Sequence, residues 1–269
     1  MQRLFDLTGE VAVVVGGTGV LGGALAEGLA AAGAAVAVVG RNAPRGEARA
    51  RAILAAGGQA GFFAADATDA AGLAEVNAAV TTQFGAPTVL VNGAGGNDPR
   101  VTVTADLPFE KIAVADWAAC FDLNLVGGAL LPCQVFGAGM AARGRGSIIN
   151  IASVAAHLPL SRVAGYAAAK AAVLNLTQFL SREWATRGVR VNSITPGFFP
   201  AEQNRRLLFD EKGEPTPRAR AILSHTPMNR FGESHELVGA AVFLASPAAS
   251  GFVTGIDLRV DGGFLAQTI

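Results

Sequence analysis

Three side chains near the middle of the chain have the types and spacing of a proton-transfer site. Tyr166 and Lys170 stand at positions i and i+4, which places a phenol and an ammonium on one face of a helix. A free tyrosine titrates near ~10, and a neighbouring ammonium is expected to lower that pKa. Ser153 follows a predicted strand and can bond the oxygen that exchanges a proton with Tyr166, the only tyrosine in the chain. The set predicts interconversion of a ketone and an alcohol.

A glycine-rich turn near the N-terminus follows the first predicted strand. Gly16 suits a tight turn that a diphosphate can approach, and Gly22 lets the next helix pack closely on the strand. The free N–H groups of that helix would face the phosphates. A glycine cluster alone indicates only a flexible turn, but its place between a strand and a helix predicts a dinucleotide site. The residues expected to line it are Gly16, Gly19, Val20, Leu21 and Gly22.

The end of the second predicted strand bears on the choice of cofactor. NAD sites usually place a carboxylate there, whereas this chain has Gly40 followed by Arg41 and Asn42. A guanidinium can pair with the 2′-phosphate of NADP, although the same arginine is also explained as a solvated loop residue. The sequence therefore favours NADP(H), with NAD(H) as the alternative.

Strands and helices alternate along the chain in an order that positions these residues. Short β-branched runs, typical of parallel strands buried on both faces, occur at residues 11–15, 36–39, 89–91, 147–151 and 189–194, and a last strand is expected at 256–260. Ala-rich stretches of helical length lie at residues 20–32, 45–56, 70–84, 110–140, 165–187 and 235–245. Glycines that favour a left-handed helix end follow at Gly33, Gly57, Gly85 and Gly188. We expect an α/β protein with a single Rossmann domain over residues 1–269, a doubly wound parallel sheet with helices on both faces.

A polar insertion, at about residues 197–232, interrupts this alternation. An insertion of this length in a compact domain is usually a lid or a binding element, and the alternative is a tolerated surface loop. We expect a lid over the substrate.

Composition excludes several classes of partner. The 21 basic and 21 acidic residues give no net charge, which argues against nucleic acid and against a polybasic membrane-surface segment. The mean hydropathy is +0.39, but glycines and Glu27 interrupt the richest apolar region, residues 11–39, and no secretory signal is visible. Two cysteines, Cys120 and Cys133, and no metal-ligand spacing predict a cytoplasmic protein without a metal.

Together these motifs resemble the single-domain short-chain dehydrogenases/reductases over essentially the whole chain. The resemblance rests on the glycine turn, Asp66, Asn92-Gly-Ala-Gly95, Asn124, Ser153, Tyr166, Lys170, Pro196-Gly197 and Val260-Asp-Gly-Gly263. It implies that Asp66 bonds the adenine amino group and that Asn92 lies along the cofactor and steadies the sheet. It also implies that Asn124 holds a water linking Lys170 to solvent, and that Lys170 bonds the nicotinamide ribose. The remaining implied cofactor contacts are Ala94, Gly95, Tyr166, Pro196 and Gly197, and the implied catalytic set is Asn124, Ser153, Tyr166 and Lys170.

The chain departs from the family pattern at three places. Val15 replaces the usual Thr, and the middle glycine, Gly19, falls one place early and is followed by Val20. Neither change removes the close approach to the backbone. Ala201 stands where the family often has a threonine that bonds the nicotinamide carboxamide, a role that Gln203 or Asn204 could take over.

A finer resemblance points to one branch of the family, the D-mannonate oxidoreductases or fructuronate reductases. It rests on residues 92–98, 121–125, 196–210 and 226–232. A sugar acid needs a cation for its carboxylate and polar partners for its hydroxyls. The candidates near the expected cleft are Asn97, Arg100, His157, Arg205 and Arg206, although each arginine singly is more readily a solvated surface charge.

Two other functions stay open, and self-association is expected. The first is reduction of another carbonyl, such as a ketose, a gluconate-type keto acid or a 3-oxoacyl thioester. The polar stretch 202–206 speaks only against the long acyl chain of the thioester. The second is a non-catalytic NADP(H) sensor, which would not need the proton-transfer residues. Surplus apolar residues on the helices over 116–140 and 165–187 predict a homotetramer or dimer, as in the family.

Overall fold

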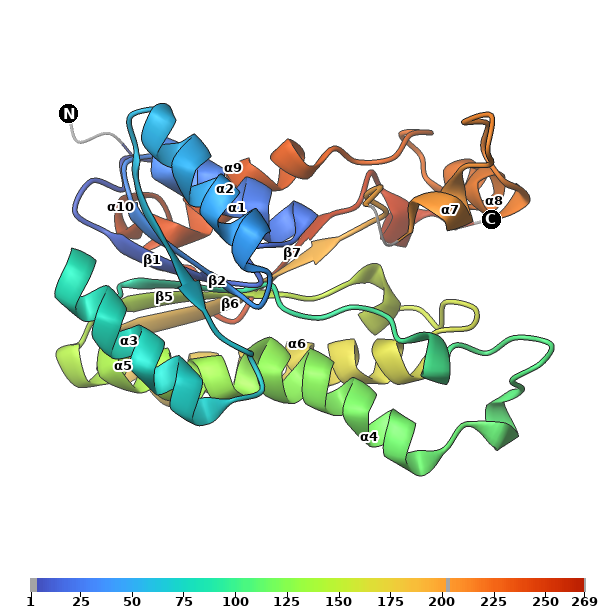
Figure 1. The fold of residues 1–269 in the computed structure, drawn as a ribbon, viewed down its shortest axis with the longest axis horizontal. Helices are drawn as coiled ribbons and strands as arrows, with labels where there is room; N and C mark the ends of the chain where they lie inside the picture. The colour runs from blue at the N-terminus through green and yellow to red at the C-terminus, as the bar shows by residue number, and fades with distance from the viewer. Residues whose placement is uncertain (1–3, 202–203, 269) are drawn as a thin grey trace.

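The computed structural model describes residues 4–201 and 204–268 of the chain. Its centre is a seven-stranded parallel sheet in the order β3-β2-β1-β4-β5-β6-β7 (Figure 1). The strands are β1 (Val11–Val15), β2 (Ala35–Gly40), β3 (Gln59–Ala64), β4 (Val89–Asn92), β5 (Gly146–Ile151), β6 (Val189–Pro196) and β7 (Asp257–Val260). The strand order reverses between β1 and β4, so the doubly wound Rossmann sheet predicted from the sequence is confirmed.

Helices cover both faces of this sheet. Figure 1 shows α1, α2 and α9 on one face and α3, α5 and α6 on the other. The helices are α1 (Val20–Ala31), α2 (Ala43–Ala55), α3 (Ala70–Phe84), α4 (Val114–Phe121), α5 (Ala138–Arg143), α6 (Ala164–Trp184), α7 (Arg205–Leu208), α8 (Pro217–His225), α9 (Val238–Ala245) and α10 (Pro247–Ser250). Leu25 and Leu244 lie in the core of the first face, whereas Phe136 and Trp184 lie in the core of the second. Burial on both faces explains why the strands are continuously apolar.

The edge strand β3 is the strand that the β-branched runs did not predict. It contains no Val or Ile and pairs only with β2. Phe62 packs against the core of one face and Phe63 against the core of the other. Aromatic residues favour strands as β-branched residues do, so these two phenylalanines were the available signal.

The glycines expected to end helices do so. Gly33, Gly57, Gly85 and Gly188 have φ values of +106°, +85°, +99° and +67°. Glycine reaches this left-handed region without the penalty that a Cβ would impose. The chain can therefore turn sharply from each helix toward the next strand.

The helix expected over residues 110–140 is less regular than predicted. It begins at Val114, because residues 109–111 form a separate 3-10 turn, and the helical run continues to Arg143. Within it, Asp122–Leu130 and Cys133–Gly137 are π-helical. Pro132, which lacks an N–H, lies between the two stretches and disturbs the usual hydrogen bonding.

The run Val114–Arg143 is also the segment of the described chain that is long and apolar enough to cross a membrane. It has 30 residues, and its most apolar window has a mean hydropathy of 1.5. Half of that window is buried inside the domain. A core helix passes the same test of length and composition, so this finding is weak evidence for a membrane.

The expected lid region, residues 197–232, lies beyond the carboxyl end of β6 and contains α7 and α8 (Figure 1). A bridge between Phe209 and Pro215 closes part of it. Leu208, Ala219 and Ile222 form a small buried cluster of their own. The described part of this region is therefore a folded unit with its own apolar contacts.

Candidate active site

The four side chains expected to act in catalysis lie at the carboxyl edge of the sheet. Ser153 follows β5, Tyr166 lies in the first turn of α6 with Lys170 one turn further, and Asn124 lies in the first π-helical stretch. Ser153 begins a 3-10 turn, Val154–Ala156, and its Oγ accepts a hydrogen bond of 3.2 Å from the N–H of Ala155. This bond orients the hydroxyl.

Lys170 is buried between α6 and β5. The residue is 4 % exposed, and its Nζ donates a hydrogen bond of 2.7 Å to the carbonyl of Ile151. Burial lowers the pKa of Lys170 to about 8. The Nζ lies 5.9 Å from the centroid of the Tyr166 ring, so the phenol and the ammonium do face each other across the helix turn.

The pKa of Tyr166 moves in the opposite direction from the one that we expected. Burial raises the pKa of Tyr166, and a hydrogen bond with Ser153 only partly opposes this effect. The expectation that the ammonium of Lys170 lowers this pKa is therefore wrong. The physical reason is that burial disfavours the charged form of each group, the phenolate of Tyr166 and the ammonium of Lys170.

Asn124 fixes the loop that follows β4. Its Oδ1 accepts a hydrogen bond of 2.8 Å from the N–H of Gly96, and its Nδ2 donates to the carbonyls of Gly96 and Cys120 at 2.9 Å each. A Cβ added at Gly95 would lie 2.7 Å from Asn124 Oδ1 and 3.4 Å from Lys170 Nζ. The π-helical stretch thus brings Asn124 close to Lys170, around a position that has no room for a side chain.

The glycine turn after β1 has the shape of a phosphate cradle. Gly16 has a φ of +84°, and a Cβ there would lie 2.6 Å from the backbone N of Ala94. A Cβ at Gly22 would lie 2.3 Å from the carbonyl oxygen of Gly16. Gly19 is the N-cap of α1 and provides no side-chain bond, so the N–H groups of Val20 and the residues after it are uncapped. These residues fit a dinucleotide diphosphate.

The residues expected at the adenosine end also come together. Nη1 of Arg41 lies 3.4 Å from Oδ2 of Asp66, while Oδ1 of Asp66 accepts hydrogen bonds from the N–H and hydroxyl of Thr68. These bonds and the charge of Arg41 hold the pKa of Asp66 below its usual value. Asn42 caps α2 by accepting a bond from the N–H of Arg45, so its side chain is already engaged within the protein.

Two further predicted cofactor positions, Asn92 and Gly197, are tightly packed. Asn92 is fully buried, and its Nδ2 donates to Oδ1 of Asn150 at 2.8 Å, which links β4 to β5. Its Oδ1 is buried without a partner. Gly197 follows Pro196 at the end of β6, where its N–H donates to the carbonyl of Val260. Both positions hold the sheet edge together.

Of the five candidates for binding a sugar acid, three are bonded within the protein. Arg100 pairs with Asp98 at 2.6 Å and with Asp116 at 3.0 Å. Asn97 donates to the hydroxyl of Thr102 at 2.7 Å. His157 Nε2 lies 3.0 Å from Oδ2 of Asp257, so it packs against β7 instead of standing free in a cleft. Arg205, whose guanidinium carbon lies 5.6 Å from the centroid of the Phe209 ring, and Arg206 remain exposed on α7.

Asn204 and Gln203 were the two residues expected to replace the missing threonine near Ala201, and the structure describes only Asn204. Asn204 accepts a bond of 2.7 Å from the N–H of Ala201 and donates to the carbonyl of Phe199 at 2.9 Å. Its side chain therefore closes a backbone turn. Gln203 lies outside the described residues.

The sequence analysis missed the polar cluster around Asp257. Oδ1 of Asp257 accepts hydrogen bonds from the hydroxyls of Ser193 and Thr195 at 2.7 and 2.8 Å, and Oδ2 meets His157. The cluster ties the turn after Ser153 to β6 and β7. A carboxylate inside a predicted strand was the signal that could have revealed it.

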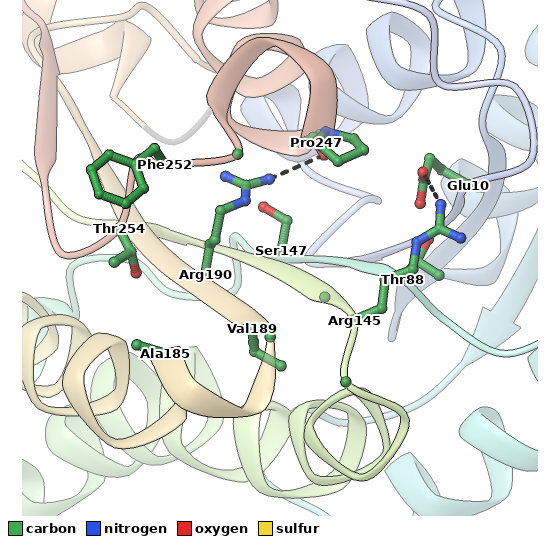
Figure 2. Close-up of a pocket in the computed structure, with 15 residues that line it drawn as sticks. Glu10, Thr88, Arg145, Ser147, Ala185, Val189, Arg190, Pro247, Phe252 and Thr254 are labelled. Atoms are coloured by element: carbon green, nitrogen blue, oxygen red, sulfur yellow. Dashed lines mark hydrogen bonds and ion pairs between the residues drawn. The ribbon is translucent and has the colours of Figure 1, made fainter.

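A cavity of about 420 Å³ lies at the opposite edge of the sheet, where the strands begin (Figure 2). Its charged groups are already bonded: Arg145 pairs with Glu10, and Arg190 donates to the carbonyl of Leu244 at 2.8 Å and to Ser250 Oγ at 2.9 Å. The carbonyl of Leu244 is among the last of α9, so Arg190 acts as a cap for this helix. None of the predicted catalytic side chains lines this cavity.

A phosphate cradle and a serine, tyrosine and lysine set at the same edge of a Rossmann sheet define the class of nicotinamide-dependent oxidoreductases. Comparison with known proteins narrows this class. A family profile described as enoyl-(acyl carrier protein) reductase matches residues 18–265. The chain is 40 % identical to the uncharacterized oxidoreductase UxuB of Bacillus subtilis (strain 168), over 98 % of this chain and 97 % of that protein.

Solved structures agree with this match. A provisionally assigned D-mannonate oxidoreductase of Haemophilus influenza, with bound NAD, is 39 % identical with a TM-score of 0.91, over 98 % of this chain and 97 % of that one. A gluconate 5-dehydrogenase of Burkholderia cenocepacia J2315, in complex with NADP and tartrate, is 36 % identical with a TM-score of 0.88, over 98 % of each chain. The protein belongs to the short-chain dehydrogenase/reductase family. It is an NAD(P)-dependent oxidoreductase that acts on alcohol groups.

Proposed function

We propose that the protein interconverts a keto sugar acid and its secondary alcohol, of the fructuronate/mannonate kind, with Tyr166 as the proton-transfer group. The observation that carries the proposal is the placement of Tyr166 between Ser153 and the buried Lys170. A bound nicotinamide cofactor supplies or accepts the hydride. The side chains of this protein handle the proton on the substrate oxygen.

In the direction of reduction, the Tyr166 phenol donates its proton to the ketone oxygen while the Ser153 hydroxyl bonds the same oxygen. The raised pKa keeps the phenol protonated at neutral pH, which suits this direction. Lys170 stabilises the phenolate that remains, and it would bond the nicotinamide ribose of the cofactor. In the direction of oxidation, the phenolate takes the proton from the alcohol.

Asn124 completes the proton path in this proposal. Its amide is close to Lys170 Nζ across Gly95 and holds the loop of Gly96. A water held at this place would pass protons from Lys170 to solvent. The set of four catalytic residues is thus Asn124, Ser153, Tyr166 and Lys170.

The glycine cradle would hold the diphosphate of the cofactor, and Arg41 and Asp66 would lie at its adenosine. The remaining contacts in the proposal come from the backbone of Asn42 and from Ala94, Gly95, Pro196 and Gly197. Asn92, which is fully buried, would support the cofactor site by fixing the end of β4. We favour NADP(H), because no carboxylate ends β2 and a Cβ at Gly40 would lie 2.7 Å from the hydroxyl of Thr18. Arg41, which is 72 % exposed in its side chain, remains available to a 2′-phosphate.

Replacement of Arg41 by alanine tests the cofactor preference. The ratio of kcat/KM for NADPH to that for NADH is expected to fall about tenfold or more, because a charge-assisted contact to phosphate is lost. Arg51→Ala is the matched control, since Arg51 is an exposed arginine of α2 that pairs with Glu47. An unchanged ratio in Arg41→Ala would contradict the preference for NADP(H).

The substrate class rests on the polar lid region and on the sugar-acid relatives. The sugar acids named for these relatives carry hydroxyls and a carboxylate, which polar and cationic side chains of the lid can bind. A long acyl chain offers no such groups. The test is oxidation of NADPH against keto-uronates, ketoses, gluconate-type keto acids and oxoacyl thioesters. The highest kcat/KM is expected for a keto-uronate, and a preference for an oxoacyl thioester would contradict the proposal. Turnover of any of these substrates excludes the remaining alternative, a non-catalytic sensor.

We also propose that the chain forms a cytoplasmic homotetramer or dimer. Phe109, Val114 and Phe179 are 60 %, 84 % and 58 % exposed. They belong to the segment before α4, to α4 and to α6, whose surplus of apolar residues suits packing against a second copy.

A further inference from the structure

Arg162 has an unusual backbone conformation for its residue type. Its φ is +75°, and among the described residues the only other non-glycine with a positive φ is Asn229. Asparagine tolerates the left-handed region because its short side chain can bond locally, whereas a long side chain costs about 1 kcal/mol or more there. Such strain persists only where the surrounding structure imposes it.

A long-range hydrogen bond fixes the backbone at Arg162. Its carbonyl accepts a hydrogen bond of 2.9 Å from the N–H of Val103, which belongs to the segment after β4. Arg162 lies in the loop between Ser153 and Tyr166, and Figure 1 shows this loop at the same end of the sheet as the 97–113 segment and α7. The strained residue is therefore held at the rim of the proposed active site.

The guanidinium of Arg162 differs from those of Arg100 and Arg41, and it stands on the loop that leads to Tyr166, whereas the exposed Arg205 and Arg206 stand on α7. Arg100 is paired with two aspartates and Arg41 with one. Arg162 is exposed, and within the described part of the chain no carboxylate or carbonyl accepts a bond from its side chain. An unpaired guanidinium on the loop that leads to Tyr166 is suited to bidentate binding of a carboxylate.

We infer that Arg162 binds the carboxylate of the substrate and thereby determines the preference for sugar acids over neutral sugars. This inference rests on the proposed function, whose substrate it specifies. Tyr166 follows Arg162 by four residues, so their Cα atoms are at most about 14 Å apart. One six-carbon keto acid can then touch the phenol with its ketone oxygen and the guanidinium with its carboxylate. The left-handed backbone and the bond from Val103 position the arginine for this contact.

The test compares two substrates of equal size, a keto-hexuronate and the corresponding neutral ketohexose. The variants are Arg162→Asn and Arg162→Gly, which remove the charge but tolerate the left-handed backbone, and Arg162→Lys, which keeps a charge. For both neutral variants, KM for the keto acid should rise about 10- to 100-fold with little change in kcat, because a charged contact is lost. Both constants for the ketohexose should stay unchanged, and Arg162→Lys should recover part of the loss.

Arg187→Ala, at an exposed arginine after α6, is the matched control and should match wild type. The inference is overturned if Arg162→Asn leaves KM for the keto acid unchanged, or if it affects both substrates equally. Binding of tartrate to the NADPH-loaded protein, measured by calorimetry, separates this inference from the proposed function. If wild type binds tartrate but does not reduce keto acids, and Arg162→Asn loses the tartrate affinity, only the proposed function is overturned. A wild type that reduces keto acids without any dependence on Arg162 would overturn only the inference.

Discussion

Lys170 and Tyr166 share one buried environment at the start of α6, and it affects both pKa values. Burial lowers the pKa of Lys170 to about 8 and raises that of Tyr166 above its usual value. Each shift favours the neutral form of the group. A neutral phenol is the form that donates a proton to a ketone, so the raised pKa of Tyr166 suits the direction of reduction.

The pKa of Lys170 makes stability depend on pH in a defined direction. Between about pH 8 and 10.5, the unfolded chain binds a proton at this lysine that the folded chain has lost. The free energy of unfolding of wild type should therefore rise with pH across this window, relative to that of Lys170→Met, by on the order of 3 kcal/mol. Urea denaturation of both proteins from pH 7 to 10.5 measures the difference. Parallel curves would show that Lys170 is not desolvated in the folded state.

At the scale of single residues, the sequence predicted which residues form the candidate site better than it predicted the burial and the charges around them. The spacing of Tyr166 and Lys170 was sufficient to place them in contact, because i and i+4 positions meet on any helix. The direction of the pKa shift was not predictable, since it depends on packing from β5 and the π-helical segment. The environments of the arginines were not predictable either. Arg100 is neutralised by Asp98 and Asp116, which its position in the sequence did not reveal. No motif in the sequence pointed to Arg162 as a binding residue.

At the scale of elements, the cofactor site depends on how closely α1 approaches the turn after β1. The Cβ positions of Gly16 and Gly22 are filled by backbone atoms at 2.6 and 2.3 Å. No rotation of a side chain can relieve such contacts. These glycines therefore set the shape of the cradle, and the helix N-terminus keeps its N–H groups open to phosphate.

Gly22→Ala tests this dependence. The added methyl group forces α1 away from the turn, so we expect a loss of about 1–3 kcal/mol in the free energy of unfolding and weaker NADPH binding. Gly57→Ala is a matched control, because Gly57 has a φ of +85° but no atom within 4 Å of the added Cβ. It should cost about 1 kcal/mol in stability and leave NADPH affinity unchanged. Equal NADPH affinity in Gly22→Ala and wild type would contradict the proposed cradle.

The elements themselves were largely predictable, and the exceptions have physical causes. Continuous β-branched runs identified the central strands, because burial on both faces selects such residues. The edge strand β3 was not predicted, because Phe62 and Phe63 stabilise it and it contains no Val or Ile. The π-helical stretches were not visible in the pattern of apolar residues, because they depend on the contacts of Asn124 and on Pro132.

At the scale of the whole molecule, the chain has no net charge, but its charged side chains are unevenly distributed. Arg41 lies at the proposed adenosine end, Lys170 at the nicotinamide end and Arg162 at the substrate rim. Asp98 and Asp116 neutralise Arg100, whereas Arg205 and Arg206 stay exposed on α7. Val114 on α4 and Phe179 on α6 are large exposed apolar side chains, which are available for contact between subunits.

Self-association is expected to depend on these apolar side chains. Light scattering at micromolar concentration should give the mass of a dimer or tetramer for wild type. Phe179→Asp places a charge on the exposed face of α6 and should shift the protein toward smaller species, whereas Leu54→Asp, at a 53 % exposed leucine of α2, should not. A monomeric mass for wild type would contradict the proposed assembly.

The central claim is that Tyr166 transfers the proton to the substrate oxygen, and Tyr166→Phe tests it most directly. The change removes one hydroxyl and leaves the ring in place. We predict that turnover of the best carbonyl substrate with NADPH falls by about 10²- to 10⁴-fold, while the Kd for NADPH, measured by fluorescence titration, stays within about twofold of wild type. Equal turnover in Tyr166→Phe and wild type, with the cofactor bound equally well, would contradict the account.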